Sequence, residues 1–296
     1  MCGPRSAISR AAPAAGEHRL TVIPPPGRPP PIPSPPTRLL ALPSGVRLEH
    51  LVTGSGDPVT LFLHGLGGGI ADTRPLGSGV PGRKVFLRMR GHGRSSAPGG
   101  RWSYADLAAD VAAVADAVGV SRALGVSLGA GALCRLVADE PARFERLVFF
   151  LPAVLDTRRA APARARLTAL SDAIASGSAD AVAEAVAVEA PPEVRGTAAA
   201  RALAAQRTAA LLDGGLSDAV ASLVDQVPVS DASALRRVAA PALVLACRGD
   251  DLHPVEVAER LAAALPSSTL HVYDEPGVLW TRRADLRSRI SEFLAN

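Results

Sequence analysis

Short apolar runs recur along this chain, separated by longer stretches in which hydrophobic residues repeat with a helical period. The runs have the length and composition of strands, and they lie at 46–53, 59–63, 85–89, 120–127, 147–151, 242–246 and 269–273. The run at 59–63 is predicted to be a buried strand, because it lies between a Gly/Asp/Pro turn and a glycine-rich segment.

Helical patterns fill the intervals between these runs. Within 104–118 four apolar residues fall at i, i+4, i+7 and i+11: Leu107, Val111, Val114 and Val118. This spacing predicts an amphipathic helix that covers a sheet face and ends at Gly119. Further helices are predicted at 130–138, at 255–265 and at the end of the chain, with Leu286, Ile290 and Phe293 on the inner face. Alternating strands and helices predict an α/β fold: a mostly parallel twisted sheet with helices on both faces.

Two parts of the chain depart from this alternation. Residues 1–37 contain a proline run at 24–31 that cannot join a helix or sheet interior, so we expect a disordered, proline-rich arm. Residues 157–236 are alanine-rich and helical in pattern, with no convincing strand. An insertion between two strands of one sheet is expected to form a helical cap over its carboxyl edge. A separate helical module is the alternative. The α/β core then comprises 38–156 and 237–296.

Composition argues against several functional classes. The formal net charge of +4 comes from scattered arginines without a basic, aromatic-interleaved run, so we expect no nucleic-acid partner. No apolar run approaches ~18 residues, and the first residues lack the apolar segment of a secretory signal, so we expect no membrane association. The cysteines are widely spaced (Cys2, Cys134 and Cys247) and no Cys/His cluster occurs. We therefore predict a cytoplasmic protein with reduced cysteines, no metal and no cofactor.

The pentapeptide at 125–129, Gly-Val-Ser-Leu-Gly, carries the clearest chemistry. It fits G-x-S-x-G and lies between a predicted strand and a predicted helix, which is the context that this motif requires. Its two glycines permit a turn so tight that the Ser127 Oγ projects from the apex, because a side chain at either position would strike a neighbouring element. Acyl transfer at such a serine also needs a base, a group that orients the base, and donors for an oxyanion.

Together with three other segments, this motif resembles the α/β-hydrolase superfamily in its capped form, over about residues 39–294. The other segments are His64-Gly65-Leu66-Gly67-Gly68-Gly69, Arg90-Gly91-His92-Gly93-Arg94-Ser95 and Gly249-Asp250-Asp251-Leu252-His253-Pro254. The resemblance implies Ser127 as nucleophile, Asp250 as triad acid, and the backbone N–H groups of Leu66 and Leu128 as the oxyanion hole. It also implies a substrate pocket near His64, Gly65 and Trp280.

The expected base is missing from its usual position. In the family the triad histidine follows the last strand as part of a Gly-His pair, whereas this chain has Gly277-Val278, and valine cannot accept a proton. In addition, Arg88 replaces the aspartate that usually precedes the Arg-Gly-His-Gly turn. Among the histidines we favour His253, three residues after Asp250, as a displaced base. We interpret the other histidines as structural or solvated residues of the arm, the strands and the loops: His18, His50, His64, His92 and His271.

We therefore predict a serine-dependent hydrolase of a small acyl substrate (an ester, thioester or lactone), either weak or with a displaced base. The alternative is a catalytically impaired or non-hydrolytic protein of the same fold that binds a small hydrophobic ligand. Apolar lining is expected from Leu155, Leu167, Leu216, Leu223 and Trp280. The arginines of the predicted cap favour a medium-sized hydrophobic or acidic substrate. The pattern predicts no oligomeric state.

Overall fold

The computed structural model describes residues 3, 35–99, 101–213 and 216–296 of the 296-residue chain. Pro36–Asn296 form one compact unit, and the description below concerns that unit. The predicted proline-rich arm, with His18, lies outside the described residues apart from its last positions. No helix in the described ranges combines the length and the apolarity needed to cross a membrane.

One sheet of eight strands organises the unit, in the order β1-β2-β4-β3-β5-β6-β7-β8. The strands are β1 Arg38–Ala41, β2 Arg47–Thr53, β3 Val59–Leu63, β4 Arg83–Leu87, β5 Arg122–Val126, β6 Arg146–Phe150, β7 Ala242–Cys247 and β8 Ser268–Tyr273. The β1–β2 and β2–β4 pairs are antiparallel, and every pair from β4 to β8 is parallel. The prediction of a mostly parallel sheet is confirmed. Strand β1 was not predicted, because its apolar run is only three residues long and its residues are largely exposed.

Helices cover both faces of the sheet. The helices outside the insert are α1 Ile70–Thr73, η1 Arg74–Gly77, α2 Tyr104–Val118, α3 Leu128–Asp139, η2 Ala232–Arg237, α9 Val255–Ala264, α10 Val278–Thr281 and α11 Arg283–Ala295. Side chains of α2, α3 and α9 share one apolar core with Leu61 and Leu63. Side chains of α11 and η1 share the other with Phe62. Neighbouring strand residues thus point to opposite faces, and both faces are buried.

Helix α2 shows how the local sequence sets its bounds. The Ser103 Oγ accepts a hydrogen bond from the backbone N–H of Asp106, and an Asp106 carboxylate oxygen accepts one from the backbone N–H of Ser103. At the other end Gly119 adopts the left-handed conformation with φ 70°, as predicted from its position. The last helix differs slightly from prediction, because Leu294 rather than Phe293 completes its buried face.

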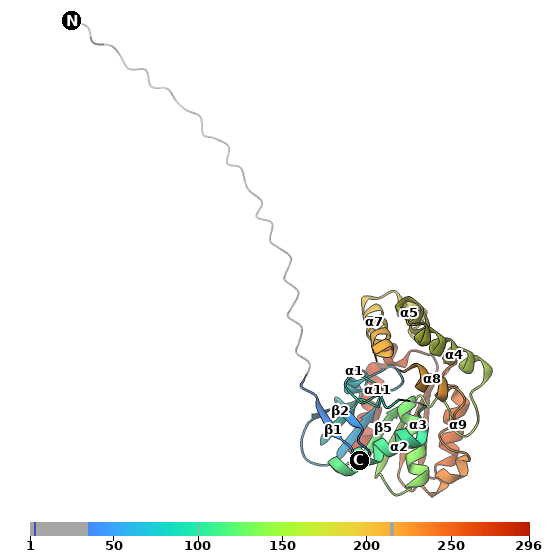
Figure 1. Cartoon of the computed structure of the whole chain (residues 1–296). Helices are drawn as coiled ribbons and strands as arrows, with labels where there is room; N and C mark the ends of the chain where they lie inside the picture. The colour runs from blue at the N-terminus through green and yellow to red at the C-terminus, as the bar shows by residue number, and fades with distance from the viewer. Residues whose placement is uncertain (1–2, 4–34, 100, 214–215) are drawn as a thin grey trace. The chain divides into compact units, whose positions relative to one another are not determined.

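Residues 157–236, called here the helical insert, connect β6 to β7, which are neighbours in the sheet. Its helices are α4 Ala161–Ser176, α5 Ala179–Ala187, α6 Pro192–Arg195, α7 Ala198–Asp213 and α8 Ser217–Leu223. Figure 1 shows α4, α5 and α7 together beyond one end of the sheet. Together with α8 they enclose a small apolar core that includes Val182, Leu211 and Val220, and Trp102 from outside the insert is part of this core. Among the described residues of the insert there is no strand.

Candidate active site

The turn between β5 and α3 holds Ser127 in a conformation that few residues adopt. Its backbone has φ 49° and ψ −102°, in the left-handed half of conformational space. A Cβ added to Gly125 would lie 2.5 Å from the carbonyl carbon of Gly129, and one added to Gly129 would lie 2.6 Å from the Cβ of Leu63. Only glycine fits at both positions, which is the reason given above for the motif.

His253 connects this serine to a carboxylate. Its Nε2 lies 2.9 Å from the Ser127 Oγ, and its Nδ1 lies 2.8 Å from the Asp250 Oδ2. Because the carboxylate only accepts, Nδ1 carries the proton and Nε2 is free to accept from the serine hydroxyl. The side chains of His253 and Asp250 are 16% and 20% exposed, so the chain of hydrogen bonds opens to solvent on one side.

The loop that carries both residues is folded by Asp250 itself. Its Oδ1 accepts hydrogen bonds from the backbone N–H groups of Leu252 at 3.0 Å and His253 at 3.3 Å. Burial raises the pKa of this carboxyl, but the hydrogen bond and charge of His253, the Leu252 amide and the charge of Arg166 together hold it below its ordinary value. Asp250 is therefore ionised at neutral pH, with one oxygen fixing the loop and the other orienting the imidazole.

Backbone donors lie next to the serine. A Cβ on Gly65 would lie 3.4 Å from the Cβ of Ser127, so the loop after β3 passes directly against the nucleophile turn. Leu66 follows in that loop. Leu128 is the first residue of α3, where the N–H has no intrahelical partner and the helix dipole is positive. Within the described part of the chain neither amide donates to another backbone group.

Two buried histidines hold the loop after β3 from below. His64 Nδ1 donates to Gly65 O at 2.7 Å and its Nε2 accepts from Met89 N at 3.0 Å. His92 Nδ1 donates to Arg90 O at 2.9 Å and its Nε2 accepts from Gly67 N at 3.0 Å. Burial, followed for His64 by the neighbouring His92, lowers the pKa of both imidazoles, that of His92 to about 4. Both rings are neutral, and the His64 ring has no free nitrogen for the substrate contact that we expected of it.

Arg88 has a partner on the adjacent strand. Its Nε lies 3.1 Å from the Glu49 Oε2, and Glu49 also accepts from the backbone N–H of Arg94 at 2.9 Å. The Arg88 side chain packs between two glycines, because a Cβ on Gly69 or Gly93 would fall within about 3 Å of it. Glu49 thus supplies the negative charge that was expected at position 88, and the ion pair supports both loops beside the pocket.

Comparison with known proteins agrees with this arrangement of strands and loops. The family model described as alpha/beta hydrolase fold matches residues 58–277, which is most of the chain. The chain belongs to the alpha/beta hydrolase fold family. The matched region includes Ser127 and the 249–254 loop and ends at Gly277, directly before Val278.

Solved alpha/beta hydrolase structures resemble the chain over most of its length. A hydrolase from Pseudomonas aeruginosa PA01 is 23% identical, with 88% of this chain and 98% of that chain covered and a TM-score of 0.74. An esterase from Exiguobacterium antarcticum is 17% identical, covering 86% and 98% at a TM-score of 0.70. The enol-lactonase from Burkholderia xenovorans LB400 is 20% identical, covering 87% and 99% at 0.71. At these identities the likeness concerns the fold.

A cavity of about 390 Å³ opens at Ser127, Asp250 and His253. Ser127, Asp250 and His253 line it from the sheet side, and Leu167, Leu170 and Leu223 line it from the helical insert. Val278 and Trp280 form part of its wall, Trp280 as expected. Two predicted lining residues are instead packed elsewhere: Leu155 in the sheet core and Leu216 in the core of the insert, both fully buried.

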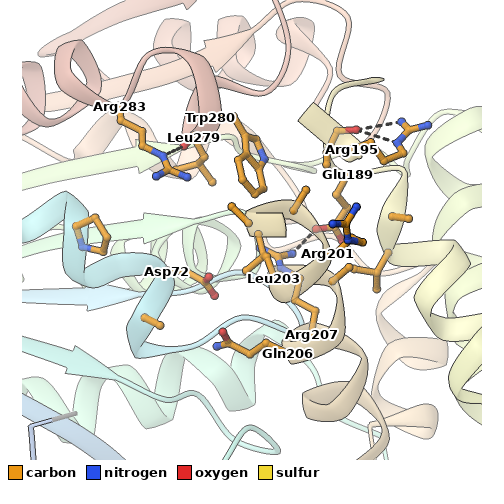
Figure 2. Close-up of a pocket in the computed structure, with 18 of the residues that line it drawn as sticks. Asp72, Glu189, Arg195, Arg201, Leu203, Gln206, Arg207, Leu279, Trp280 and Arg283 are labelled. Carbon is orange, nitrogen blue, oxygen red and sulfur yellow. Dashed lines mark hydrogen bonds and ion pairs between the residues drawn. The ribbon is translucent and has the colours of Figure 1, made fainter. Parts of the chain in front are cut away.

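A second cavity of about 670 Å³ adjoins the first, and Trp280, Leu76, Glu189 and Arg207 are among the residues that line both. Figure 2 shows the labelled arginines Arg195, Arg201, Arg207 and Arg283 around this cavity, together with Leu203, Leu279 and Trp280. Arg195 and Arg201 donate to backbone carbonyls, and Arg207 pairs with Glu189. The lining of this second cavity, called the outer cavity below, therefore combines charged and apolar side chains.

Two further histidines, His50 and His271, lie away from Ser127. His50 is buried on β2, and His271 lies on β8 with its ring against Tyr273 at 4.5 Å. The polar side chains that line the cavity and were not predicted include Tyr104, Arg159 and Arg166. Tyr104 is the first residue of α2, and the two arginines belong to the insert. In the insert, the sequence pattern does not distinguish arginines that line the cavity from arginines on the solvent-exposed helix faces. No group of three or more His, Cys, Asp or Glu among the described residues could hold a metal ion.

Proposed function

We propose that this protein is a serine-dependent hydrolase of small acyl substrates, an ester, thioester or lactone, with Ser127, His253 and Asp250 as its catalytic triad. The observation that carries the proposal is the pair of hydrogen bonds at His253, 2.9 Å to the serine hydroxyl and 2.8 Å to the carboxylate. The esterase and enol-lactonase among the similar structures support hydrolysis of an acyl bond as the reaction class.

The first half of the reaction forms an acyl-enzyme. The Ser127 Oγ attacks the substrate carbonyl carbon while its proton passes to the His253 Nε2, and Asp250 stabilises the resulting imidazolium. The carbonyl oxygen becomes an oxyanion, which the N–H groups of Leu66 and Leu128 stabilise. When the intermediate collapses, the bond to the leaving group breaks and the imidazolium returns the proton to that group.

The second half releases the acid and restores the serine. His253 Nε2 takes a proton from a water molecule as the water oxygen attacks the acyl carbon, and the same two amides stabilise the second oxyanion. Collapse breaks the bond to Ser127 Oγ, which recovers its proton from His253. The open side of His253 and Asp250 gives water access for this step.

Two departures from the family pattern motivated the alternative of a non-hydrolytic binding protein. Each now has a counterpart in the structure: His253 is within hydrogen-bonding reach of Ser127, and Arg88 is paired with Glu49. The geometry therefore supports the hydrolase over the binding protein. We further propose that the helical insert acts as a cap over the bound substrate, and that the protein acts in the cytoplasm, where free thiols such as Cys134 and Cys247 persist.

Covalent labelling tests the proposal. A fluorophosphonate reacts with activated serines, so at pH 8 the wild-type protein should gain one adduct, mapped by peptide mass to Ser127, and should hydrolyse 4-nitrophenyl esters. Ser127→Ala should lose both the adduct and the turnover while keeping the same unfolding transition. A folded wild-type protein that gains no adduct at Ser127 would be evidence against a hydrolase.

A further inference from the structure

The catalytic cavity is lined by four arginines, and they differ in what their guanidinium groups already bind. The four are Arg159, Arg166, Arg195 and Arg207. Arg159 donates to the carbonyls of Leu223 and Val224 and to the Tyr104 hydroxyl at 3.2 Å. Arg195 donates two N–H groups to Ala190 O. Arg207 is paired with Glu189.

Arg166 is the exception. It lies on α4, is half-buried, and forms no hydrogen bond or ion pair with any part of the chain that the structure describes. Leu167 and Leu170, on the same helix, line the cavity beside it. A guanidinium group in this position offers five N–H donors in a planar fork next to an apolar wall.

The acidic groups of the cavity do not neutralise this arginine. Asp72 accepts from the backbone N–H of Gly69 at 2.8 Å, Glu189 is paired with Arg207, and Asp250 is bonded to His253. Asp251 is exposed and forms no ion pair within the described residues. Arg166 therefore brings a positive charge into the cavity without a direct counter-ion of its own.

The arginines of the outer cavity fit such a role less well. Arg195, Arg201 and Arg283 each donate to a backbone carbonyl, and Arg283 also stacks 5.3 Å from the Trp280 ring centroid. Arg287 lies on an exposed surface, where water already satisfies it. Among the arginines that line the two cavities, Arg166 combines partial burial with a free hydrogen-bonding fork in the cavity that Ser127 and His253 also line.

We propose that Arg166 binds a carboxylate on the substrate, so that the preferred substrates are acyl compounds with a second, ionised carboxyl group, such as monoesters of dicarboxylic acids. The proposal rests on the proposed hydrolase function. The planar fork matches a carboxylate through two parallel N–H···O bonds, and the partly enclosed site strengthens them. Leu167 and Leu170 contact the methylene groups that separate the carboxylate from the reacting carbonyl.

A pair of substrates of equal length tests this. Mono-4-nitrophenyl adipate carries a terminal carboxylate, and 4-nitrophenyl hexanoate carries a methyl group in its place. In Arg166→Met, which keeps an unbranched apolar side chain but removes the guanidinium group and its charge, kcat/KM for the adipate ester should fall about 10- to 100-fold. For the hexanoate ester it should change less than about threefold, because the charge of Arg166 is the weakest of the influences that lower the pKa of Asp250.

Arg164 provides the matched control. It lies on the same helix, but it is exposed, pairs with Asp225 at 3.0 Å and does not line the cavity, so Arg164→Met should leave the ratio of the two substrates unchanged. Equal losses on both esters in Arg166→Met would instead assign Arg166 to electrostatic support of Asp250 and overturn the proposal. The proposal would also be overturned if wild type and Arg166→Met each hydrolysed the two esters with the same kcat/KM.

A binding measurement separates this proposal from the proposed function. Calorimetric titration of the Ser127→Ala protein with adipate needs no catalysis, and it should show a dissociation constant about tenfold or more lower than in Ser127→Ala/Arg166→Met. If adipate fails to bind, or binds both proteins equally, carboxylate recognition is wrong even if Ser127 is labelled. If Ser127 is not labelled but adipate binds through Arg166, the hydrolase is wrong and the carboxylate site stands.

Discussion

Two loops at the carboxyl edge of the sheet differ in the side chains that they carry. The β7–α9 loop (248–254) carries both an ionised carboxylate and an imidazole, each partly exposed and joined at 2.8 Å. The β8–α10 turn (274–278) ends in Val278, which is 1% exposed and packs into the core shared with α11. In the family that turn provides the histidine. In this chain it provides an apolar wall, while Gly277, with φ 77°, lies so close to Pro191 that a Cβ would clash with it.

The difference indicates that the triad we propose is defined by its distances rather than by its order along the chain. Ser127 follows β5 and the β7–α9 loop lies two strands away, and residues of that loop and of the β8–α10 turn line the same cavity as Ser127. Placing acid and base three residues apart lets one turn position both. Each of the following changes tests one side of the comparison.

Removing the base should have the largest effect. His253→Ala should lower kcat/KM for a 4-nitrophenyl ester by about 10⁴- to 10⁶-fold, because His253 is the one side chain among the described residues that is hydrogen-bonded to the Ser127 Oγ. Measurements of kcat/KM at pH 8, on variant protein whose unfolding midpoint equals that of wild type, would test this fall. His271→Gln, on β8 and outside the cavity, should stay within about threefold of wild type. A His253→Ala enzyme within tenfold of wild type would place the base elsewhere.

Substituting Asp250 tests whether the β7–α9 loop positions both the acid and the base. In Asp250→Asn the amide oxygen still accepts from the Leu252 and His253 amides, so the loop should stay folded. The amide NH₂ disfavours the productive tautomer of His253, and kcat should fall about 10⁴-fold. The neighbouring Asp251→Asn should cost less than about tenfold. The expectation fails if Asp251→Asn causes the greater loss.

The remaining histidines near the pocket should affect stability rather than catalysis. The pKa of His92 is about 4 in the folded protein, against an ordinary value of 6.5, so only the unfolded chain takes up a proton between these values. The contribution of His92 to the free energy of unfolding is therefore complete above pH 6.5. It is lost as the pH falls towards 4, and the loss is about 3 kcal/mol in all. Urea unfolding at pH 7 and pH 4.5 should show this loss.

The variant His92→Gln isolates the histidine's share of that loss. Its amide oxygen is able to accept from Gly67 N, but it has no proton to gain in this range. The fall in unfolding free energy between the two pH values should therefore be smaller in His92→Gln than in wild type. Equal falls would mean that groups other than His92, such as His64 and the carboxylates, cause the pH dependence.

On the other side of the comparison, Val278→Ala should show a structural role. Removing two buried methyl groups should lower the free energy of unfolding by about 1–3 kcal/mol. The kcat per folded molecule should stay within about tenfold of wild type, measured with active-site titration to correct for unfolded protein. A loss of kcat as large as that of His253→Ala would contradict the comparison.

Much of the fold was readable from local patterns. Strands such as Val59–Leu63 are apolar except for Thr60, and α2 has both its capping residues and its C-terminal glycine in the sequence. Strand β1 was missed because its apolar run is short and directly follows the proline-rich segment, and α1 and η1 are too short to show a period.

The site was readable only in part. Ser127 and Asp250 lie in motifs, and His253 was a candidate because of its place beside Asp250. The orientation of its ring depends on how Asp250 Oδ1 folds the loop and how that loop meets the β5 turn, which no local pattern encodes. The partner of Arg88 is a glutamate on β2, brought near by strand pairing, and Arg166 looks like any other arginine on a surface helix.

The most direct measurement of the central claim is the rate at which a fluorophosphonate labels Ser127 in His253→Gly, with and without added imidazole. If His253 is the base, labelling should fall at least about 10³-fold, and imidazole diffusing into the vacated space should restore part of it in proportion to its concentration. His271→Gly should label at the wild-type rate and gain nothing from imidazole. Wild-type labelling of His253→Gly without imidazole would contradict the account.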